Sequence, residues 1–192
     1  MPDLVRLTLP PTAEALGALA AGDEVELDGF AYTARDATHE RLLAELDRDG
    51  ELPYGLAGQA LFYAGPAPPA AGRPAGAIGP TTARRMDRWT PRLLEAGVAA
   101  TIGKGARSPS VVEACRRHGA VYLAAVGGAA ALLARHVTAL QVVAYADLGP
   151  EALARVTLAG FPAFVAIDTA GRDLYAEAAA EWRGASEGAG DA

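Results

Sequence analysis

The sequence predicts one layered α/β domain with a mixed sheet, rather than a simple doubly wound sheet. Its 192 residues are enough for one substantial domain and too few for two of ordinary size. Hydrophobic residues make up 51 % of the chain, so a well-filled core is available. Strand patterns alternate with helix patterns in the C-terminal half, whereas the N-terminal third has a hairpin-like pattern. These observations together predict the fold class.

The N-terminal residues are expected to form three short strands and one short helix. Residues 4–10 alternate in polarity and predict a strand, and residues 12–22 predict a helix that stops at a glycine. Residues 23–34 alternate again, with Asp28-Gly29 as a hairpin turn between two strands.

A longer helix is predicted over residues 35–50. Asp36 is its expected N-cap, since a short carboxylate side chain can accept from the first free backbone N–H groups. Its buried stripe is formed by Leu42, Leu43 and Leu46.

The middle of the chain is expected to supply two strands and two helices. The strands are residues 58–65 and 98–103. The helices are residues 90–97 and 108–119, and each opens on a hydroxyl residue followed by proline and ends at a glycine. Residues 66–77 are too rich in proline and glycine for either element and predict an exposed loop.

In the C-terminal part, residues 120–134 predict a buried strand, a turn at Gly127-Gly128 and a helix. Residues 139–156 predict a strand, a loop and a helix. Residues 161–175 predict two strands joined across residues 168–171.

The domain is expected to span residues 1–176. Residues 177–192 have nothing to bury beyond Trp182 and predict a flexible C-terminal tail.

Charge and composition exclude several classes of protein. A net charge of −6 and the lack of a basic stripe argue against nucleic-acid binding. The longest apolar stretch, residues 120–134, contains two glycines and is shorter than the roughly 20 residues of a membrane span. The N-terminus lacks the pattern of a signal peptide. We therefore expect a cytoplasmic protein that is not associated with a membrane.

The stretch GPTTARR, residues 79–85, predicts an anion site. Gly79-Pro80 forces a turn, and Thr81 and Thr82 could cap a helix that begins near residue 83. The backbone N–H groups at such a helix start attract anions, and Arg85 lies about one turn further on. The planar guanidinium suits a carboxylate better than a lysine does.

Plainer interpretations of the same residues stay open. The two threonines could serve as an ordinary N-cap, and Arg84 is expected to face solvent. Arg35 could be an exposed charge at a helix start, and Lys104 a turn lysine, because GKG lacks the spacing of a phosphate-binding loop. Cys115, the single cysteine, is expected to be a small core residue.

Several stretches together resemble the iron–sulfur hydro-lyases, specifically the β subunit or C-terminal domain of class I fumarases and L-tartrate dehydratases. The resemblance runs from about residue 4 to residue 176 and follows the family's order and spacing. It rests on YTARDATHERL, GQALFYAGPAP, GPTTARRMDRWTP, IGKGARSPSVVEA, GAVYLAAVGGAAALLA, AYADLGPEAL and FPAFVAIDTAGRDLY. The fifth stretch and DLGPEAL are more similar to the fumarase branch.

The resemblance implies a swivelling β/β/α fold and a set of site residues. Thr81 matches the threonine proposed as catalytic base, and Lys104 matches the active-site lysine. Arg35 and Arg85 match arginines that bind the substrate carboxylates, and Thr82 adjoins the same pocket. A threonine hydroxyl is a poor base alone and needs a neighbouring proton acceptor, which in the family comes from the other subunit.

The implied function is the reversible hydration of fumarate to malate. The resemblance implies a 4Fe-4S cluster held by a partner α subunit, in an α2β2 assembly, and the single cysteine of this chain fits that division, because one thiol cannot hold a cluster. Two alternatives stay open within this enzyme class, an L-tartrate dehydratase and a mesaconate hydratase β subunit. An alternative from another class is a non-catalytic module that binds a dicarboxylate.

Overall fold

A single mixed sheet organises the protein, as the structure, a computed structural model, shows for residues 4–188 (side chains for 4–183). Within these residues the sheet has seven strands. They are β1 (Val5–Leu9), β2 (Glu24–Thr33), β3 (Ala60–Phe62), β4 (Ala100–Gly103), β5 (Val121–Ala124), β6 (Val137–Ala144) and β7 (Leu153–Ile167). The predicted α/β class with a mixed sheet is confirmed.

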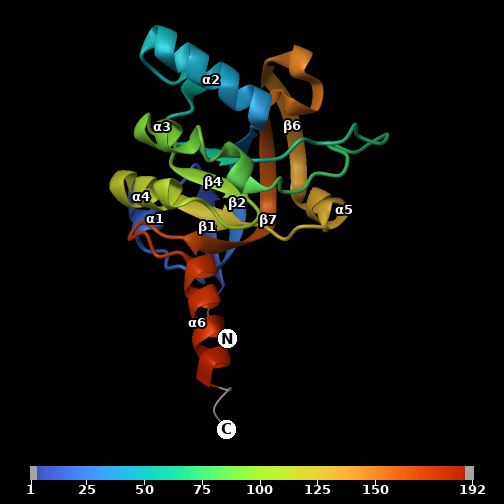
Figure 1. Ribbon diagram of the computed structural model, residues 1–192. Coiled ribbons are helices and arrows are strands. Elements are labelled where there is room, and N and C mark those ends of the chain that lie inside the picture. The colour runs from blue at the N-terminus through green and yellow to red at the C-terminus, as the bar shows by residue number, and fades with distance from the viewer. Residues whose placement is uncertain (1–3, 189–192) are drawn as a thin grey trace.

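Helices connect the strands, and α2, α3 and α4 lie along one side of the sheet in Figure 1. The α-helices are α1 (Ala13–Gly17), α2 (Asp36–Asp49), α3 (Thr90–Glu95), α4 (Pro109–His118), α5 (Ala130–Leu133) and α6 (Leu174–Gly188). Short 3₁₀ turns are η1 (Pro53–Gly55), η2 (Ala83–Met86), η3 (Ala134–His136) and η4 (Ala146–Glu151). Among the helices of the described residues, none combines the length and apolar character that crossing a bilayer requires.

Five of the strands, β2, β3, β4, β5 and β7, pair in a closed ring. Neighbouring strands from β2 to β5 pair in parallel, and β7 is antiparallel to both β2 and β5. β1 pairs with β2 and β6 pairs with β7 outside this closed part. Because successive side chains of a strand point to opposite faces, the closed sheet has an inner and an outer apolar face.

Two core clusters follow from this alternation. On β3, Phe62 belongs to a cluster built mainly from strand residues. Its ring packs edge-on against the Phe161 ring, with 5.3 Å between the ring centroids. Its neighbours Leu61 and Tyr63 belong to the second cluster, which includes side chains of α2, α3 and α4. Burial of one large apolar side chain contributes about 1.5–3 kcal/mol, so both layers stabilise the edge from which the site residues project.

β2 is one continuous strand, so the hairpin expected at Asp28-Gly29 is wrong. The register of β2 against β7 shifts between Leu27 and Gly29, which marks a β-bulge. Gly29 has φ 109°, and a Cβ there would overlap the Leu9 carbonyl oxygen. The Asp-Gly pair forms a bulge rather than a turn. The two halves of β2 do not pair with each other, because both pair with β7, which is distant in the sequence.

Two expected elements near the C-terminus are also wrong. The helix expected at the end of residues 139–156 does not form, because the 3₁₀ turn η4 ends at Glu151 and Leu153 already lies in β7. Pairing of this segment with β2 and β6 overrides its helical pattern. The second strand expected after residues 168–171 is reduced to a bridge between Ile167 and Asp173.

The segment expected to be a tail begins as a helix. α6 runs to Gly188 and extends away from the sheet in Figure 1. Residues 189–192 of the expected tail lie outside the described residues. The flexibility of the tail and the boundary at residue 176 stay predictions.

Candidate active site

The carboxyl ends of β2, β3, β4 and β5 form one edge of the sheet, and the predicted site residues gather there. Arg35 follows β2 and Lys104 follows β4. The GPTTARR stretch is attached to the same edge, since Thr81 N donates to Tyr63 O, just after β3, at 2.6 Å. In α/β proteins with open or closed parallel sheets, ligands bind outside the carboxyl ends of the strands, so the placement fits a binding site.

Backbone hydrogen bonds hold the two threonines beside the lysine. Lys104 N donates to Thr81 O at 3.2 Å, and Ala83 N donates to Lys104 O at 2.9 Å, so Thr82 and Lys104 form a parallel bridge. Gly103 permits this close approach, because a Cβ there would lie 2.9 Å from Ala83 Cβ. Main-chain hydrogen bonds therefore fix the backbone of the two threonines relative to the backbone of Lys104.

Thr82 and Lys104 line one hollow of about 480 Å³, with Phe164 and Tyr175 on its wall. The lysine side chain crosses Gly127, where a Cβ would lie 3.1 Å from Lys104 Cδ and 3.6 Å from Nζ. Among the described residues no hydrogen bond or ion pair involves the Lys104 ammonium group. It is therefore available to an anion.

Arg35 lies at the start of α2 with an extended backbone and a half-buried side chain. Its Nη2 is 3.3 Å from Glu151 Oε1 on η4. Gly65 leaves room for the guanidinium, since a Cβ there would lie 3.1 Å from Arg35 Nη1. Arg35 Nε is buried without a hydrogen-bond partner in the described part of the chain, so one of its donors is unused.

Arg85 reaches the same edge through Asp36. Arg85 Nε donates to Asp36 Oδ1 at 3.1 Å, and Arg85 Nη2 lies 2.9 Å from Asp36 Oδ2. Asp36 directly follows Arg35, so this pair brings the two predicted arginines to one region. Neither arginine lines the hollow of Thr82 and Lys104.

The expected capping by Asp36 is wrong, and this explains why its carboxylate is free for Arg85. Arg35 is the N-cap of α2 and makes no side-chain cap bond. Glu151 Oε2 caps the helix instead, because it accepts from Ala37 N at 2.9 Å. Sequence reasoning missed Glu151, which lies more than a hundred residues away.

The threonine hydroxyls are not used as helix caps either. The segment after Thr82 is a four-residue 3₁₀ turn, and Thr82 makes no side-chain cap bond to it. Arg84 is exposed, as predicted, and has no side-chain partner among the described residues.

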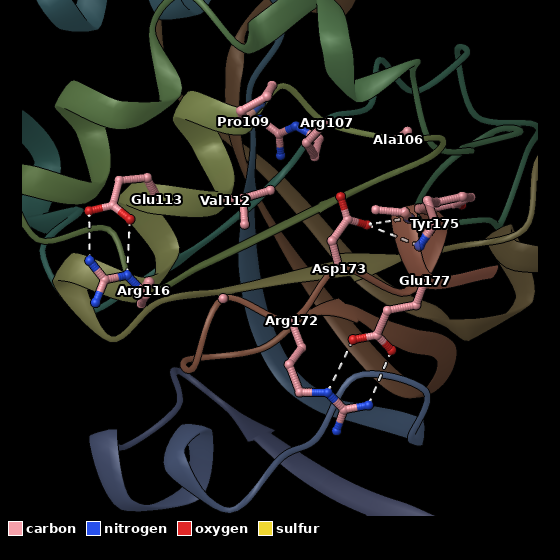
Figure 2. A pocket seen from close by; sticks show the side chains of 12 residues that line it. Ala106, Arg107, Pro109, Val112, Glu113, Arg116, Arg172, Asp173, Tyr175 and Glu177 are labelled. Atoms are coloured by element: carbon pink, nitrogen blue, oxygen red, sulfur yellow. Dashed lines mark hydrogen bonds and ion pairs between the residues drawn. The ribbon is translucent and has the colours of Figure 1, made fainter. Parts of the chain in front are cut away.

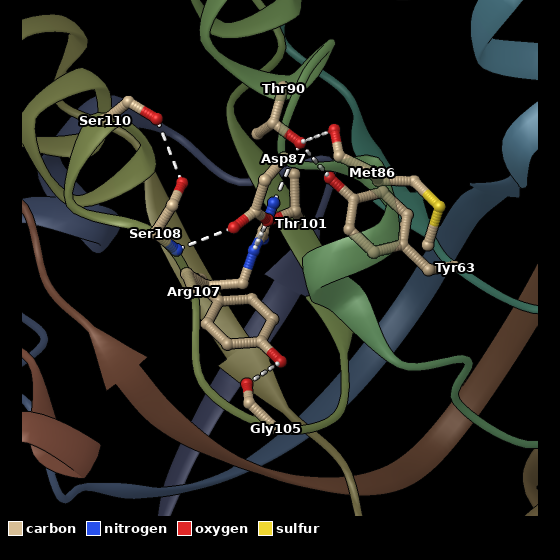
Figure 3. Close-up of polar contacts among 10 residues, drawn as sticks. Tyr63, Met86, Asp87, Thr90, Thr101, Gly105, Arg107, Ser108 and Ser110 are labelled. Carbon is tan, nitrogen blue, oxygen red and sulfur yellow. Dashed lines mark hydrogen bonds and ion pairs between the residues drawn. The ribbon is translucent and has the colours of Figure 1, made fainter.

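Sequence reasoning missed a buried polar cluster around Arg107, which follows Lys104 by three residues (Figure 3). Arg107 Nε donates to Asp87 Oδ1 at 2.7 Å and Arg107 Nη2 donates to Thr90 Oγ1 at 2.8 Å. Thr90 lies inside α3 rather than capping it, and its hydroxyl donates to Met86 O. The Arg107 cluster comprises Tyr63, Asp87, Thr90, Thr101, Arg107 and Tyr122.

His39 supports Arg35 from inside the domain. It is fully buried, and its Nδ1 lies 2.7 Å from Arg35 O, which requires a proton on Nδ1 because a carbonyl oxygen only accepts. Its ring packs against Tyr63 and Trp89 at centroid distances of 5.2 Å and 5.6 Å. Burial lowers the pKa of His39 from 6.5 to about 4, so its ring is neutral at pH 7.

The described residues do not fit an iron–sulfur cluster. Cys115 is fully buried in α4, and burial raises the pKa of its thiol to about 12, opposite to what a thiolate ligand needs. Within residues 4–183 no group of three or more His, Cys, Asp or Glu side chains could hold a metal ion. Cys115 is a small core residue, as predicted.

A larger hollow of about 750 Å³ lies between α4 and the start of α6 (Figure 2). Its Glu113 pairs with Arg116 and its Arg172 pairs with Glu177. None of the predicted site residues lines it. Because these charges are paired within the chain, this hollow is less suited to a carboxylate than the one beside Lys104.

Fold and site together define an α/β domain with hydroxyl and cationic side chains at the carboxyl edge of its parallel strands. Residues 3–178 match the family model described as Fumarase C-terminus, and the chain belongs to that family. The family expected from the sequence motifs is thereby confirmed.

The chain is similar to fumarate hydratases and to a tartrate dehydratase subunit. The class I, anaerobic fumarate hydratase of Escherichia coli K12 is 38 % identical over 170 residues, 86 % of this chain and 31 % of the relative. Fumarate hydratase 2 of Leishmania major is 36 % identical over 166 residues, 85 % of this chain and 29 % of the relative. The chain thus spans about a third of the length of these fumarate hydratases. The L(+)-tartrate dehydratase subunit beta of Escherichia coli K12 is 38 % identical over 177 residues, 89 % of this chain and 86 % of the relative.

Proposed function

We propose that this chain is the β subunit of a hydro-lyase that interconverts fumarate and malate together with a partner chain. The observation that carries the proposal is the bridge between Thr82 and Lys104 at the carboxyl edge of the sheet. It holds Thr82 beside Lys104, and both residues line one hollow, which Thr81 does not line. The ammonium group of Lys104 has no partner among the described residues, and relatives of the chain are named as hydratases and dehydratases. We place the assembly, proposed as α2β2, in the cytoplasm.

Cationic side chains are proposed to bind the two carboxylates of the substrate. Lys104 offers an ammonium group at the hollow, and about a quarter of the Arg35 side chain is exposed at the same edge of the sheet. Arg85 is half exposed and bound to Asp36, so it can exchange that carboxylate for one of the substrate. These cations also stabilise the extra negative charge that develops when a proton leaves the carbon next to a carboxylate.

Thr81 is proposed to transfer the proton as catalytic base, with Thr82 lining the substrate pocket. Both backbone groups of Thr81 are hydrogen-bonded, to Tyr63 and Lys104, so its position is fixed while its hydroxyl has no partner among the described residues. A hydroxyl acts as a base only when another group accepts its proton. Asp87 cannot be that group, because it is bonded to Arg107, and we propose that the partner chain supplies it.

The 4Fe-4S cluster is proposed to reside on the partner chain, since the described residues of this chain do not fit it. Support for a partner comes from the relative named tartrate dehydratase subunit beta, whose name implies a second subunit.

L-tartrate is the second candidate substrate. The match to the tartrate dehydratase subunit beta covers 86 % of that relative at 38 % identity, the same identity as the E. coli fumarate hydratase. The fumarase-like stretches at residues 119–134 and 147–153 favour fumarate. Mesaconate is the remaining alternative of the same class.

The decisive experiment is anaerobic co-expression of this chain with a cluster-bearing partner, followed by kcat/KM for fumarate, L-tartrate and mesaconate. We expect fumarate to be preferred, and the isolated chain to be inactive. Thr81→Val should abolish turnover, whereas Thr138→Val, an exposed threonine on β6, should not. An isolated chain that binds dicarboxylates tightly and captures no partner would instead support a non-catalytic binding module.

A further inference from the structure

We infer that Arg107 and Asp87 are positioning residues that fix Lys104 relative to the segment carrying Thr81 and Arg85. The inference deepens the proposed function and rests on it for its catalytic consequence. Neither residue is exposed enough to touch a substrate, since Arg107 is 5 % and Asp87 is 8 % exposed. Arg107 and Asp87 therefore act on the site through the residues that precede them in the chain, which are Lys104 and the GPTTARR segment.

Two segments are joined at two successive places. The first joint is the bridge between Thr82 and Lys104. The second joint lies a few residues further along both segments, where Asp87 Oδ1 accepts from Arg107 Nε at 2.7 Å and Asp87 Oδ2 accepts from Ser108 N at 2.6 Å. Thr82 and Lys104 form the first joint themselves, and the second joint fixes the residues that follow each of them in the chain.

The loop between the joints is also anchored. Tyr122 OH donates to Gly105 O at 2.9 Å, directly after Lys104. The Arg107 guanidinium lies over the Tyr122 ring, 4.7 Å from its centroid. Rotation of the loop would break this hydrogen bond, so the backbone that carries Lys104 has little freedom.

The hydrogen bonds of the Arg107 cluster fix the position of the guanidinium group. Three guanidinium nitrogens donate in three directions, to Asp87, Thr90 and Thr101. Thr90 donates to Met86 O, so Tyr63 OH donates to Thr90 Oγ1 at 3.0 Å. Breaking one side of a buried ion pair leaves an uncompensated charge, and the surrounding segments move to solvate it.

A chemical feature of the chain gives this inference a direct test. Lys104 is the only lysine in the sequence. Reductive methylation of the full chain with ¹³C-formaldehyde therefore yields one lysine NMR signal, and the terminal α-amine serves as an internal reference. We would record the chemical shift and the pH titration of this signal.

Three variants leave the lysine count unchanged. Asp87→Asn removes the carboxylate, the double variant Arg107→Gln/Asp87→Asn removes both charges, and Tyr122→Phe removes only one hydroxyl. Leu16→Ala, in the other core cluster, controls for general loss of stability. Asp47→Asn, which breaks an exposed pair with Arg92, controls for the loss of an ordinary ion pair.

We expect the Lys104 signal to shift in the three cluster variants and to stay in place in both controls. Tyr122→Phe, the mildest change, keeps the test valid even where the charge variants unfold. An unchanged signal in the folded cluster variants would overturn the inference, and so would an equal shift in Leu16→Ala.

In the two-chain enzyme, Tyr122→Phe and Asp87→Asn should lower kcat/KM at least about tenfold, because small displacements of a positioning group can cost about 10²-fold. If the wild-type two-chain enzyme shows no hydro-lyase activity, the proposed function fails. The NMR result still decides whether Arg107 and Asp87 position Lys104.

Discussion

Arg85 and Asp36 form a two-point ion pair between segments that lie 49 residues apart in the sequence. Half of the Arg85 side chain is exposed, and exposed pairs contribute at most about 1 kcal/mol to stability. The pair is therefore better suited to holding a guanidinium ready at the site than to stabilising the fold. It also links Arg35, the residue before Asp36, to the threonine motif.

Arg85→Ala should lower kcat/KM of the reconstituted enzyme by about 10²-fold or more, since loss of one donor to a developing anion costs about 3 kcal/mol. Its Tm should change little, because the ion pair is exposed. Arg88→Ala is the matched control, because Arg88 also bonds to α2, through Glu40, and is exposed. Equal losses in the two variants would contradict a substrate-binding role for Arg85.

Thr81→Ser should retain most of the turnover, whereas Thr81→Val should lower kcat by at least about 10²-fold, the lower end of what general acid–base catalysis contributes. The reason is that only the hydroxyl can move a proton, while the backbone bonds of Thr81 survive either change. Steady-state kinetics at saturating substrate would measure this. A fully active valine variant would remove Thr81 from the mechanism.

Gly127→Ala should weaken substrate binding by displacing the Lys104 side chain, because the new Cβ would lie 3.1 Å from Lys104 Cδ. We expect KM to rise several-fold and the lysine NMR signal to shift. Gly17→Ala is the control, since a Cβ at that glycine meets nothing within 4 Å. The prediction fails if both variants behave as the wild type does.

His39 should make the protein less stable as the pH falls. Its pKa is about 4 in the folded state and near 6.5 when unfolded, so between these values the unfolded chain binds a proton that the folded chain does not. The free energy of unfolding should therefore decrease by about 3 kcal/mol from this group between pH 7 and pH 4. The contribution is fully present above pH 7.

His39→Phe should remove this component of the pH dependence, which urea titrations at pH 7 and pH 4.5 would measure. His118→Gln, at an exposed position, should leave the pH dependence unchanged. A His39→Phe variant with the slope of the wild type would show that the buried ring does not carry the effect.

Cys115→Ala should leave the iron content of the reconstituted two-chain enzyme unchanged. The thiol is buried and its pKa is raised to about 12, so it is a packing residue rather than a ligand. Iron analysis and the visible absorption spectrum would check this. Loss of iron with an intact fold would place part of the cluster on this chain.

Local sequence patterns were sufficient to predict most of the elements whose ends are set by neighbouring residues. α4 begins at Pro109 and ends before Gly119 as predicted, because proline and glycine act within one turn. The Asp28-Gly29 pair was misinterpreted, because the same two residues suit a tight turn and a bulge. Only the position of β7 distinguishes these two structures.

The sequence by itself determined the family and the residue types of the candidate site, since both depend on motifs that are continuous in the chain. The tertiary structure decided which of those residues meet. It paired Thr82 with Lys104 and Arg85 with Asp36, capped α2 with Glu151, and buried Arg107 against Asp87. These contacts arise from strand order and helix docking, so their energies depend on distances in space that no local pattern encodes.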